Sequence, residues 1–381
     1  MSRIEITPVK GIGSFLNFCK VPRLIYKGCK GFAPSLDAER WTLYAAKLNP
    51  HYALVDSQAW LARRDGKLVG RIFAQIYKDG IVPVGASPAQ FGCLDAIEDE
   101  AVVAALIGTA ENWLRQRGAT RINGPFSPSV NGEVGMLVEG FDATPMIFMP
   151  WSPAYLPGLL ESRGYHKARD LISYRYAVTA ADRTDKPGIL ARPEWRDRLK
   201  IRTIDLTAMK KEAAVLVDVF NDAWSENWGF VPFTFDEFMS VADSMKYVMP
   251  PEGGFMVELD GTVQAFGVIL PNLHEITADL EGHLFPLGLP KLISRLRSHN
   301  FKTARLLLFG IRRALHRKAA GGAVILAFIE ECRRRSRAKD SVEHVEFGWV
   351  LEDNMGMRRP IELSGAKIDK IHRVYEKDLV A

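Results

Sequence analysis

The sequence predicts a mixed α/β (α+β) fold in two domains, on two observations. Its 381 residues exceed one domain of ordinary size, and 47% hydrophobic with 25% charged residues are values of a soluble globular protein. The same order of elements, a hairpin followed by alternating strands and helices, occurs once in each half. We therefore expect an N-terminal domain over residues 1–180, a charged linker with Pro and Gly over 181–199, and a C-terminal domain over 200–381.

The N-terminal half opens its repeat with a hairpin. Apolar Ala59–Ala62 and Leu68–Ile76 flank Asp65-Gly66, a pair that favours a tight turn between antiparallel strands. The apolar pattern then predicts strands at Gln90–Asp95, Ala119–Gly124 and Leu171–Val178, and helices at Ala101–Arg117 and Ala154–Arg163. Upstream, the two prolines of Phe15–Ser35 argue against one long helix. That segment either packs on the domain, covers a substrate cleft or lies at a membrane interface.

The C-terminal half repeats this order. Its hairpin turns at Asp260-Gly261, between Phe255–Leu259 and Val263–Leu270. The remaining predicted elements are strands at Lys200–Thr203, Val342–Val350 and Ile368–Glu376, and helices at Met209–Trp224 and Asn354–Leu363. In the middle of this half, an apolar strand over Leu306–Ile311 leads through a turn to a helix over Ala323–Glu331.

The turn between that strand and helix is basic and then almost free of side chains. Its residues are Arg312, Arg313, His316, Arg317 and Lys318, followed by Ala319, Ala320, Gly321 and Gly322. Backbone N–H groups, the positive end of a helix and cations in one place suit a phosphate or pyrophosphate. An ordinary strand-to-helix connection with a solvated basic loop explains the same residues equally well.

Charge is concentrated around this turn. Residues 285–340 carry fourteen Lys and Arg against three acidic residues, a net charge of +11, while the whole chain has +5. Such a patch favours a phosphorylated cofactor or an anionic membrane surface. Nucleic acid is not expected as a partner, because no interleaved aromatics or nucleic-acid-binding motif accompany the charge.

Several function classes are disfavoured by what the sequence lacks. No apolar run approaches the ~18 residues that a membrane span needs, and the first residues do not resemble a secretory signal. The four cysteines have no CxxC spacing, so we expect a reducing cytoplasm and no metal site. No pattern predicts an oligomeric state.

Two loops are candidates for binding a substrate. The long loop Gly124–Pro153 contains Asn131 and Glu133, and loops of this length usually bind something. The aromatic run Phe220–Phe235 contains Glu226, Asn227, Trp228 and Phe230 beside a Gly-Phe-Val-Pro turn, which suits the lip of a cleft, although aromatic density also indicates a core. We expect Asn131, Asn227, Trp228 and Phe230 to contact substrate.

The element order with its phosphate-binding turn resembles the GNAT acyltransferase fold, here in tandem. Arg317–Gly322 matches the GNAT signature R/Q-x-x-G-x-G/A with Ala320 in place of the first glycine, and Asn354 and Gly365 occupy two further GNAT positions. The resemblance implies acyl-CoA as co-substrate, without a metal. The residues that would hold the acyl-CoA are Arg317, Lys318, Ala320, Gly321, Gly322 and Asn354. A backbone amide among Phe309, Gly310 and Ile311 would bind the thioester oxygen. The tyrosine acid of many GNAT enzymes would fall near Ile361 and is missing.

The two candidate loops are similar to those of a bacterial tandem-GNAT family that includes bacterial ceramide synthases. This resemblance implies transfer of a long acyl chain to the amine of a sphingoid base, sphinganine or its 3-oxo precursor, by direct attack. Glu346 and Glu226 are the first candidates for the base, with His316 and Glu133 behind them. A small soluble amine or amino-acid acceptor, or a non-catalytic lipid- or partner-binding role, are the alternatives. The amphipathic stretch Leu280–Leu296 is expected to guide lipid and rest on the cytoplasmic face of the membrane, although it equally suits a helix that closes a domain interface.

Overall fold

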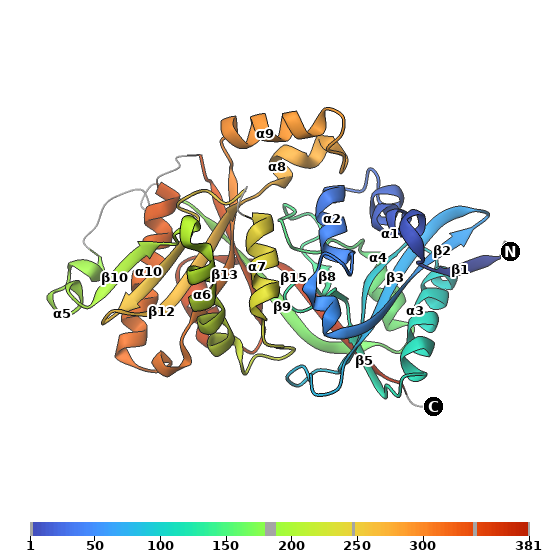
Figure 1. The fold of residues 1–381 in the computed structure, drawn as a ribbon, viewed down its shortest axis with the longest axis horizontal. Coiled ribbons are helices and arrows are strands. Elements are labelled where there is room, and N and C mark those ends of the chain that lie inside the picture. Colours follow the sequence, from blue (N-terminus) through green and yellow to red (C-terminus); the bar gives the residue numbers. More distant parts are fainter. Residues whose placement is uncertain (1–2, 180–187, 246–247, 338–340, 380–381) are drawn as a thin grey trace.

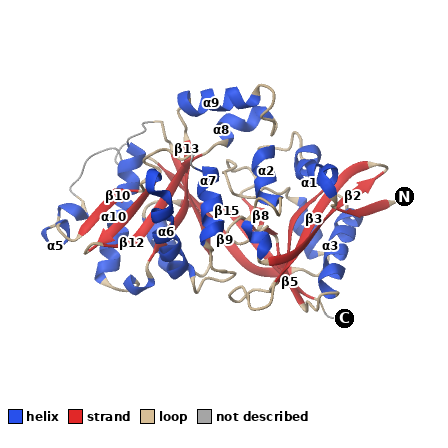
Figure 2. Cartoon of the chain, viewed as in Figure 1, coloured by secondary structure: helices blue, strands red, loops and turns tan. Residues whose placement is uncertain are grey.

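A computed structural model describes residues 3–179, 188–245, 248–337 and 341–379. One 13-stranded sheet runs through both halves of the molecule, with helices on both of its faces (Figures 1 and 2). The strands of the N-terminal half are β1 (Ile4–Pro8), β2 (Val55–Arg64), β3 (Lys67–Tyr77), β4 (Ala89–Ala96), β5 (Arg121–Gly124), β6 (Phe126–Ser127), β7 (Glu133–Val134), β8 (Met136–Glu139) and β9 (His166–Ala177). Those of the C-terminal half are β10 (Leu199–Thr203), β11 (Gly254–Leu259), β12 (Thr262–Pro271), β13 (Thr303–Ile311), β14 (His344–Leu351) and β15 (Lys367–Asp378).

The helices cover the sheet in each half from two sides. Those of the N-terminal half are α1 (Gly11–Ile25), α2 (Asp37–Tyr44), α3 (Glu100–Arg115) and α4 (Tyr155–Glu161). Those that follow are α5 (Pro193–Arg196), α6 (Met209–Trp224), α7 (Phe235–Met245), α8 (His274–Thr277), α9 (Gly288–Ser298), α10 (Ala319–Arg337) and α11 (Met355–Leu363). In the C-terminal half α6 and α7 pack on one face and α10 on the other, because their apolar residues fall into two separate core clusters.

The two halves exchange their last strands. The strand order is β1-β2-β3-β4-β5-β15-β9-β14-β13-β12-β11-β10. The final strand of the chain, β15, pairs with β5 of the N-terminal half, and β9 from the N-terminal half pairs with β14 of the C-terminal half. β9 and β15 also pair with each other at the centre of the molecule. The halves that follow one another in the sequence are therefore interlocked in space.

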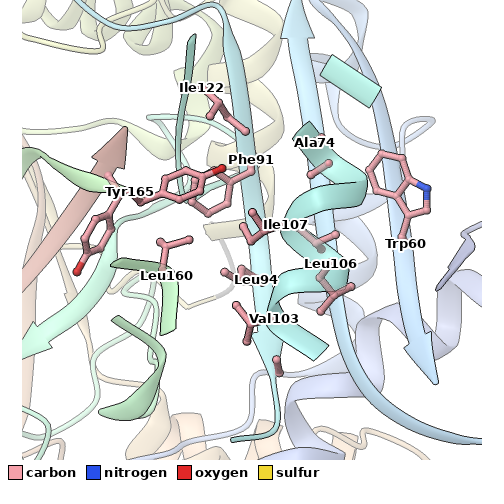
Figure 3. Packing of buried hydrophobic residues seen from close by; sticks show 14 of the residues in the cluster. Trp60, Ala74, Phe91, Leu94, Val103, Leu106, Ile107, Ile122, Leu160 and Tyr165 are labelled. Carbon is pink, nitrogen blue, oxygen red and sulfur yellow. The ribbon is translucent and has the colours of Figure 1, made fainter. Parts of the chain in front are cut away.

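The core of the N-terminal half shows why α3 forms where it does. Val103, Leu106 and Ile107 on one face of α3 contact the apolar side of the sheet, including Phe91 and Leu94 of β4 (Figure 3). Asp99 caps the helix by accepting a hydrogen bond from the Val102 amide at 3.0 Å. The predicted helix and strand pattern is thus confirmed here.

Both predicted hairpins are confirmed, and their turns show why Asp-Gly occupies them. Asp65 and Gly66 have φ of 51° and 78°, and Asp260 and Gly261 have 52° and 79°. A type I′ turn needs positive φ at both central residues, which Gly adopts at no cost and Asp tolerates.

One sequence-based expectation is confirmed and one is wrong. No single helix spans Phe15–Ser35: α1 ends at Ile25, three residues after Pro22, and residues 32–36 are not helical. α10 begins at Ala319 instead of Ala323, so the small residues assigned to the turn form the first turn of the helix. Residues 181–187 of the expected linker lie outside the described residues, as do Lys339 and Asp340 of the basic region.

Candidate active site

The sheet opens between β13 and β14. The two strands run parallel and pair at four positions, from Thr303↔His344 to Leu306↔Phe347. Both strands are irregular next to this point. The ladder between β12 and β13 shifts its register at Val268/Ile269, and the ladder between β14 and β9 shifts at Phe347/Val350. Beyond this point Leu307–Ile311, which we name the open edge, has no strand partner toward β14. Its Phe309 carbonyl accepts a hydrogen bond from Trp224 Nε1 at 3.1 Å. Backbone groups without a ladder partner must bond elsewhere, so the remaining groups on this side suit a bound molecule. Phe309, Gly310 and Ile311 all lie on it.

The helix that follows this strand presents its N-terminus beside the open edge. Residues 312–318, the basic turn, connect β13 to α10, with Arg317 in the left-handed region at φ 61°. A Cβ on Gly321 would fall 2.1 Å from the Leu315 carbonyl oxygen, so this glycine permits the tight turn. A Cβ on Gly322 would meet nothing within 4 Å. The first amides of a helix have no intrahelical acceptor and carry its positive end, so they suit an anion.

The cations of the basic turn divide into two groups. Arg312 pairs with Asp218 of α6, and Arg313 pairs with Glu226 and donates its backbone N–H to Asp222 at 2.9 Å. His316, Arg317 and Lys318 are exposed, and no ion pair joins them to another residue in the part of the chain that the structure describes. The charges of Arg317 and Lys318 therefore remain available to an anion at the N-terminus of α10.

A cavity with a volume of about 160 Å³ lies between β13, β14, α10 and α11. Its walls are mainly apolar and include Ala304, Leu306, Phe309, Ile325, Phe328 and Phe347. One side of the cavity is open to solvent, so it is an accessible pocket and not a void within the core. Its apolar walls suit an apolar group of a ligand.

The opposite face of the same strands holds a buried charged cluster of Arg305, Glu346 and Lys370. Arg305 Nε lies 3.3 Å from Glu346 Oε1, and Lys370 Nζ lies 2.5 Å from Glu346 Oε2. The three residues are 2%, 1% and 4% exposed. Arg305 also donates to the Gly348 carbonyl at 3.1 Å and to the Ile147 carbonyl of the long loop. The cluster thus fixes the long loop to the point where β13 and β14 part.

A second cavity, of about 110 Å³, is lined by residues of the N-terminal half and by His274 of α8. Its wall mixes apolar and polar side chains, and we name it the polar cavity after the latter. Glu133 accepts two hydrogen bonds from Arg40, at 2.9 and 2.6 Å, inside it. Burial raises the pKa of Glu133, but the charge and hydrogen bonds of Arg40 outweigh burial and hold that pKa below its usual range. Arg40 Nε, Trp151 Nε1 and His274 Nδ1 line this polar cavity and are buried without a hydrogen-bond partner among the described residues. Such orphaned atoms are costly unless a polar ligand or water meets them.

The four candidate bases do not form one constellation. Glu346 lies in the buried cluster and Glu133 in the polar cavity. Glu226 is exposed and forms an ion pair with Arg313, and His316 is exposed in the basic turn. Asn354 caps α11 by accepting from the Met357 amide at 3.2 Å.

The two candidate substrate loops do come together. Trp228 stacks on Phe126 of the long loop with ring centroids 6.4 Å apart, and it donates to the Gly85 carbonyl at 2.9 Å. Phe230 is buried in the core beneath α6 and α7, and Asn227 accepts through its carbonyl from the Phe230 amide. Asn131 lies half-buried in the turn between β6 and β7.

Sequence reasoning missed Arg305, Lys370, His372, Arg40 and His274. Arg305 carried a signal, because it is a charged residue inside an otherwise apolar strand. The others become recognisable only once strands from both halves are side by side.

His372 on β15 predicts a pH dependence of stability. Its Nε2 bonds the Pro150 carbonyl at 2.9 Å, and burial lowers its pKa to about 3. Because the unfolded chain takes up this proton near pH 6.5, the contribution is complete above that pH and is lost as the pH falls toward 3, by about 1.4 kcal/mol per unit. Urea unfolding of the native protein at pH 7 and pH 5 should show this loss, and His372→Gln should reduce it. An equal pH response in both proteins would contradict this.

The equivalent opening in the N-terminal half is closed. β4 and β5 pair at one position only, Gln90↔Asn123, but a Cβ on Gly92 would fall 1.6 Å from the Phe126 carbonyl oxygen, so the long loop fills the gap. Asp99 stands at the start of α3, where the C-terminal half has cations. A helix end with exposed cations beside an open strand edge thus occurs in the C-terminal half.

The chain is similar to two bacterial proteins over nearly its whole length. It is 38% identical to Protein YghO of Escherichia coli (strain K12), over 97% of this chain and 95% of that protein. It is 36% identical to Bacterial ceramide synthase of Caulobacter vibrioides (strain NA1000 / CB15N), over 99% and 98%. The chain belongs to the tandem-GNAT acyltransferase family of these proteins. No protein-family model matches it.

Solved structures agree with this tandem-GNAT fold. A tandem GNAT protein from the clavulanic acid biosynthesis pathway has a TM-score of 0.58 at 15% identity, covering 100% of this chain and 99% of its own. A GCN5-related N-acetyltransferase from Sphaerobacter thermophilus has a TM-score of 0.53 at 14% identity, covering 99% and 96%. The predicted mixed α/β tandem-GNAT fold is therefore confirmed. As a member of this family, the present chain is an acyltransferase. None of its described helices has the length and apolar character that crossing a bilayer requires.

Proposed function

We propose that this acyltransferase is a bacterial ceramide synthase, which transfers a long acyl chain from acyl-CoA to the amine of a sphingoid base. The observation that carries the proposal is the 36% identity to a protein of that name across 99% of this chain. The geometry supports it, because a cationic helix end, an open strand edge and an apolar cavity adjoin one another in the C-terminal half.

The proposed donor site follows from these features. The diphosphate of coenzyme A lies over the first turn of α10, near Arg317, Lys318, Ala320, Gly321 and Gly322. The thioester reaches the open edge, where a backbone N–H stabilises the negative charge that develops on its oxygen. The amine nitrogen attacks the carbonyl carbon, the C–S bond breaks, and the thiolate of coenzyme A leaves while the amine loses a proton.

The proposed acceptor site is the polar cavity, whose wall includes His274 of the C-terminal half. Its wall includes Met149, whose sulfur lies 3.0 Å from Arg305 Nη2, and the same guanidinium group bonds the Gly348 carbonyl at the opening of the sheet. A sphingoid base offers an amine and oxygen groups to the unpartnered atoms of Arg40, Trp151 and His274. An alkylamine has a pKa of about 10.4, so it must lose its proton before attack, for which Glu346, Glu226, His316 and Glu133 remain our candidate bases.

Thiol release measured with a panel of acyl-CoAs and amines tests this function. Palmitoyl-CoA with sphinganine or 3-oxosphinganine should release free coenzyme A and form the N-acyl product. Activity only with acetyl-CoA, or only with soluble amines, would replace the proposal by a small-amine transferase. No product with any pair would favour a non-catalytic lipid-binding role.

The segment around α9 supports our proposal that the protein docks peripherally on the cytoplasmic face of an anionic membrane. Phe285 and Leu287 are 79% and 67% exposed, and Ile293 on α9 is 44% exposed beside the cations Lys291 and Arg297. α8 and α9 stand apart from the sheet at the top of Figure 1. In the loop before α9, the Gly282 carbonyl accepts a hydrogen bond from the Asp37 amide at 2.8 Å. Asp37 closely follows residues 32–35, which line the polar cavity. A lipidic amine would therefore enter from the membrane side.

Flotation with phosphatidylserine-containing liposomes should recover the native protein with the lipid. Phe285→Ser with Leu287→Ser should lower the bound fraction about tenfold or more, since each buried apolar side chain contributes about 1.5–3 kcal/mol. Leu363→Ser serves as the control, because Leu363 is 87% exposed on α11 and lies outside this segment. Native protein that stays with the soluble fraction, or equal loss in the control, would contradict membrane docking through α9.

A further inference from the structure

The apolar cavity of the C-terminal half spans the place where the sheet opens. Leu306, the last residue of β13 that pairs with β14, and Phe309, on the open edge, both line it. Phe347 lines it from β14 and Met357 from α11. The cavity therefore begins where the proposed thioester would lie and continues behind the paired part of the two strands.

The cavity is elongated along β13. It reaches from Phe309 back to Thr303, six residues along the strand, which correspond to about 20 Å. Along α10, which follows β13 through a tight turn and packs against it, the lining runs from Ile325 near the N-terminus to Arg335 near the far end. The shape is thus a channel with one end at the open edge and the other between the start of β13 and the end of α10.

Polar groups at the far end are already engaged. Thr303 Oγ1 donates to Glu275 Oε1 at 2.5 Å. Arg335 donates to Glu331 at 2.6 Å and to backbone carbonyls, and its guanidinium lies 4.6 Å from the centre of the Phe255 ring. A ligand in the channel would accordingly meet mainly apolar walls, with Thr303 and Arg335 engaged within the protein. The other polar residues of the lining are Tyr176, Glu252, Arg333 and Ser364.

We propose that this channel receives the acyl chain of the donor, with the thioester at Phe309 and the methyl end toward Thr303, and that its depth sets the accepted chain length. The inference rests on the proposed function for the identity of the donor, and it goes beyond it by assigning the site and the residues that select chain length. The buried charged cluster on the other face of β13 separates the acyl chain from the acceptor side.

Two positions divide the channel, and one gives a matched control. Ile325 lies on α10 close to the open edge, and Ala304 lies on β13 in the far part. Leu326 is the neighbour of Ile325 on the same helix but is 45% exposed and does not line the channel. We therefore compare Ile325→Trp, which fills the near part, Ala304→Phe, which fills the far part, and Leu326→Phe, which fills neither.

The test measures the affinity of the full-length protein for acetyl-, octanoyl- and palmitoyl-CoA by titration calorimetry. In the native protein the affinity should rise by about fourfold per methylene while the chain fills the channel. Ala304→Phe should bind palmitoyl-CoA about tenfold or more weakly and octanoyl-CoA as before. Ile325→Trp should weaken both, and all variants should bind acetyl-CoA like the native protein.

Each outcome decides for or against the channel. Native affinity that does not depend on chain length, or a native profile in both filled variants, overturns the inference. A native profile in Leu326→Phe supports it, and a shifted profile in this control overturns the assignment to the channel. Thermal unfolding of each variant identifies a misfolded one, for which Ala304→Leu and Ile325→Phe are the milder replacements. Binding that depends on chain length, without N-acyl product from any amine, would support the channel and refute the proposed transfer. Product formed equally from all chain lengths would support the transfer and refute the channel.

Discussion

Gly322→Leu is expected to lower the affinity for coenzyme A about tenfold or more while leaving the free protein as stable as before. A Cβ at this position would meet nothing within 4 Å beyond the helix's own backbone, and Gly322 is exposed, so we expect the protein to accommodate the larger side chain. Leucine also has a higher helix propensity than glycine, by up to about 1 kcal/mol. The space that the new side chain occupies lies before the first turn of α10, where the diphosphate is proposed to bind, and a loss of tenfold corresponds to about 1.4 kcal/mol.

Calorimetric titration with coenzyme A and urea unfolding, both on the full-length variant, measure these two quantities separately. Arg317→Glu is the companion variant, because it reverses an exposed charge of the basic turn without filling space. Gly321→Ala is the structural control and should lose stability as well as affinity, since its Cβ would approach the Leu315 carbonyl to 2.1 Å. Native affinity in both Gly322→Leu and Arg317→Glu would reject the diphosphate assignment.

Glu346→Gln is expected to lower the free energy of unfolding by about 3–5 kcal/mol. The substitution removes the one carboxylate that lies between the buried cations Arg305 and Lys370, and breaking a buried ion pair leaves an uncompensated charge. Asp369, 2.7 Å from Lys370 Nζ, compensates only one of the two cations. Urea unfolding at pH 7 measures the loss, with Glu343→Gln as the control, because Glu343 forms an exposed pair with Lys302.

The same variant separates a structural role of Glu346 from a catalytic one. If Glu346 acts through the cluster, the turnover per folded molecule falls modestly and the pH profile of kcat keeps its shape. If Glu346 is the base, kcat falls by about 10²–10⁴-fold in the folded fraction and the acidic limb of the profile changes, because a base works only when it is deprotonated. A stability equal to that of the native protein would show that the cluster does not hold the fold together.

The local elements were predictable from the sequence where a turn or a period specified them. Asp65-Gly66 and Asp260-Gly261 placed both hairpins, and α6 runs over the predicted residues Met209–Trp224. The start of α10 was misplaced, because Gly321 and Gly322 are weak helix formers and the space beside Leu315 is a tertiary constraint. Propensity alone does not contain such a constraint.

The site was predictable only in part, for a similar reason. The basic turn was recognisable because charge and small residues are adjacent in the sequence. The apolar cavity is walled by β13, β14, α10 and α11, and its lining residues come from all four. The polar cavity joins Arg40 and Glu133 to His274, more than a hundred residues away. No local pattern reports such distances.

The exchange of β9 and β15 has a consequence for how the molecule is made. Tyr375 faces Gly124 in the central ladder, so residues separated by some two-thirds of the chain must meet before either lobe is finished. Contacts of such separation form slowly, since the long intervening loop must close first. During synthesis, the edge of β5 in the N-terminal half therefore stays unpaired until β15 has been made. The C-terminal half cannot be produced alone with a complete sheet, because β9, from the first half of the chain, pairs with its strand β14.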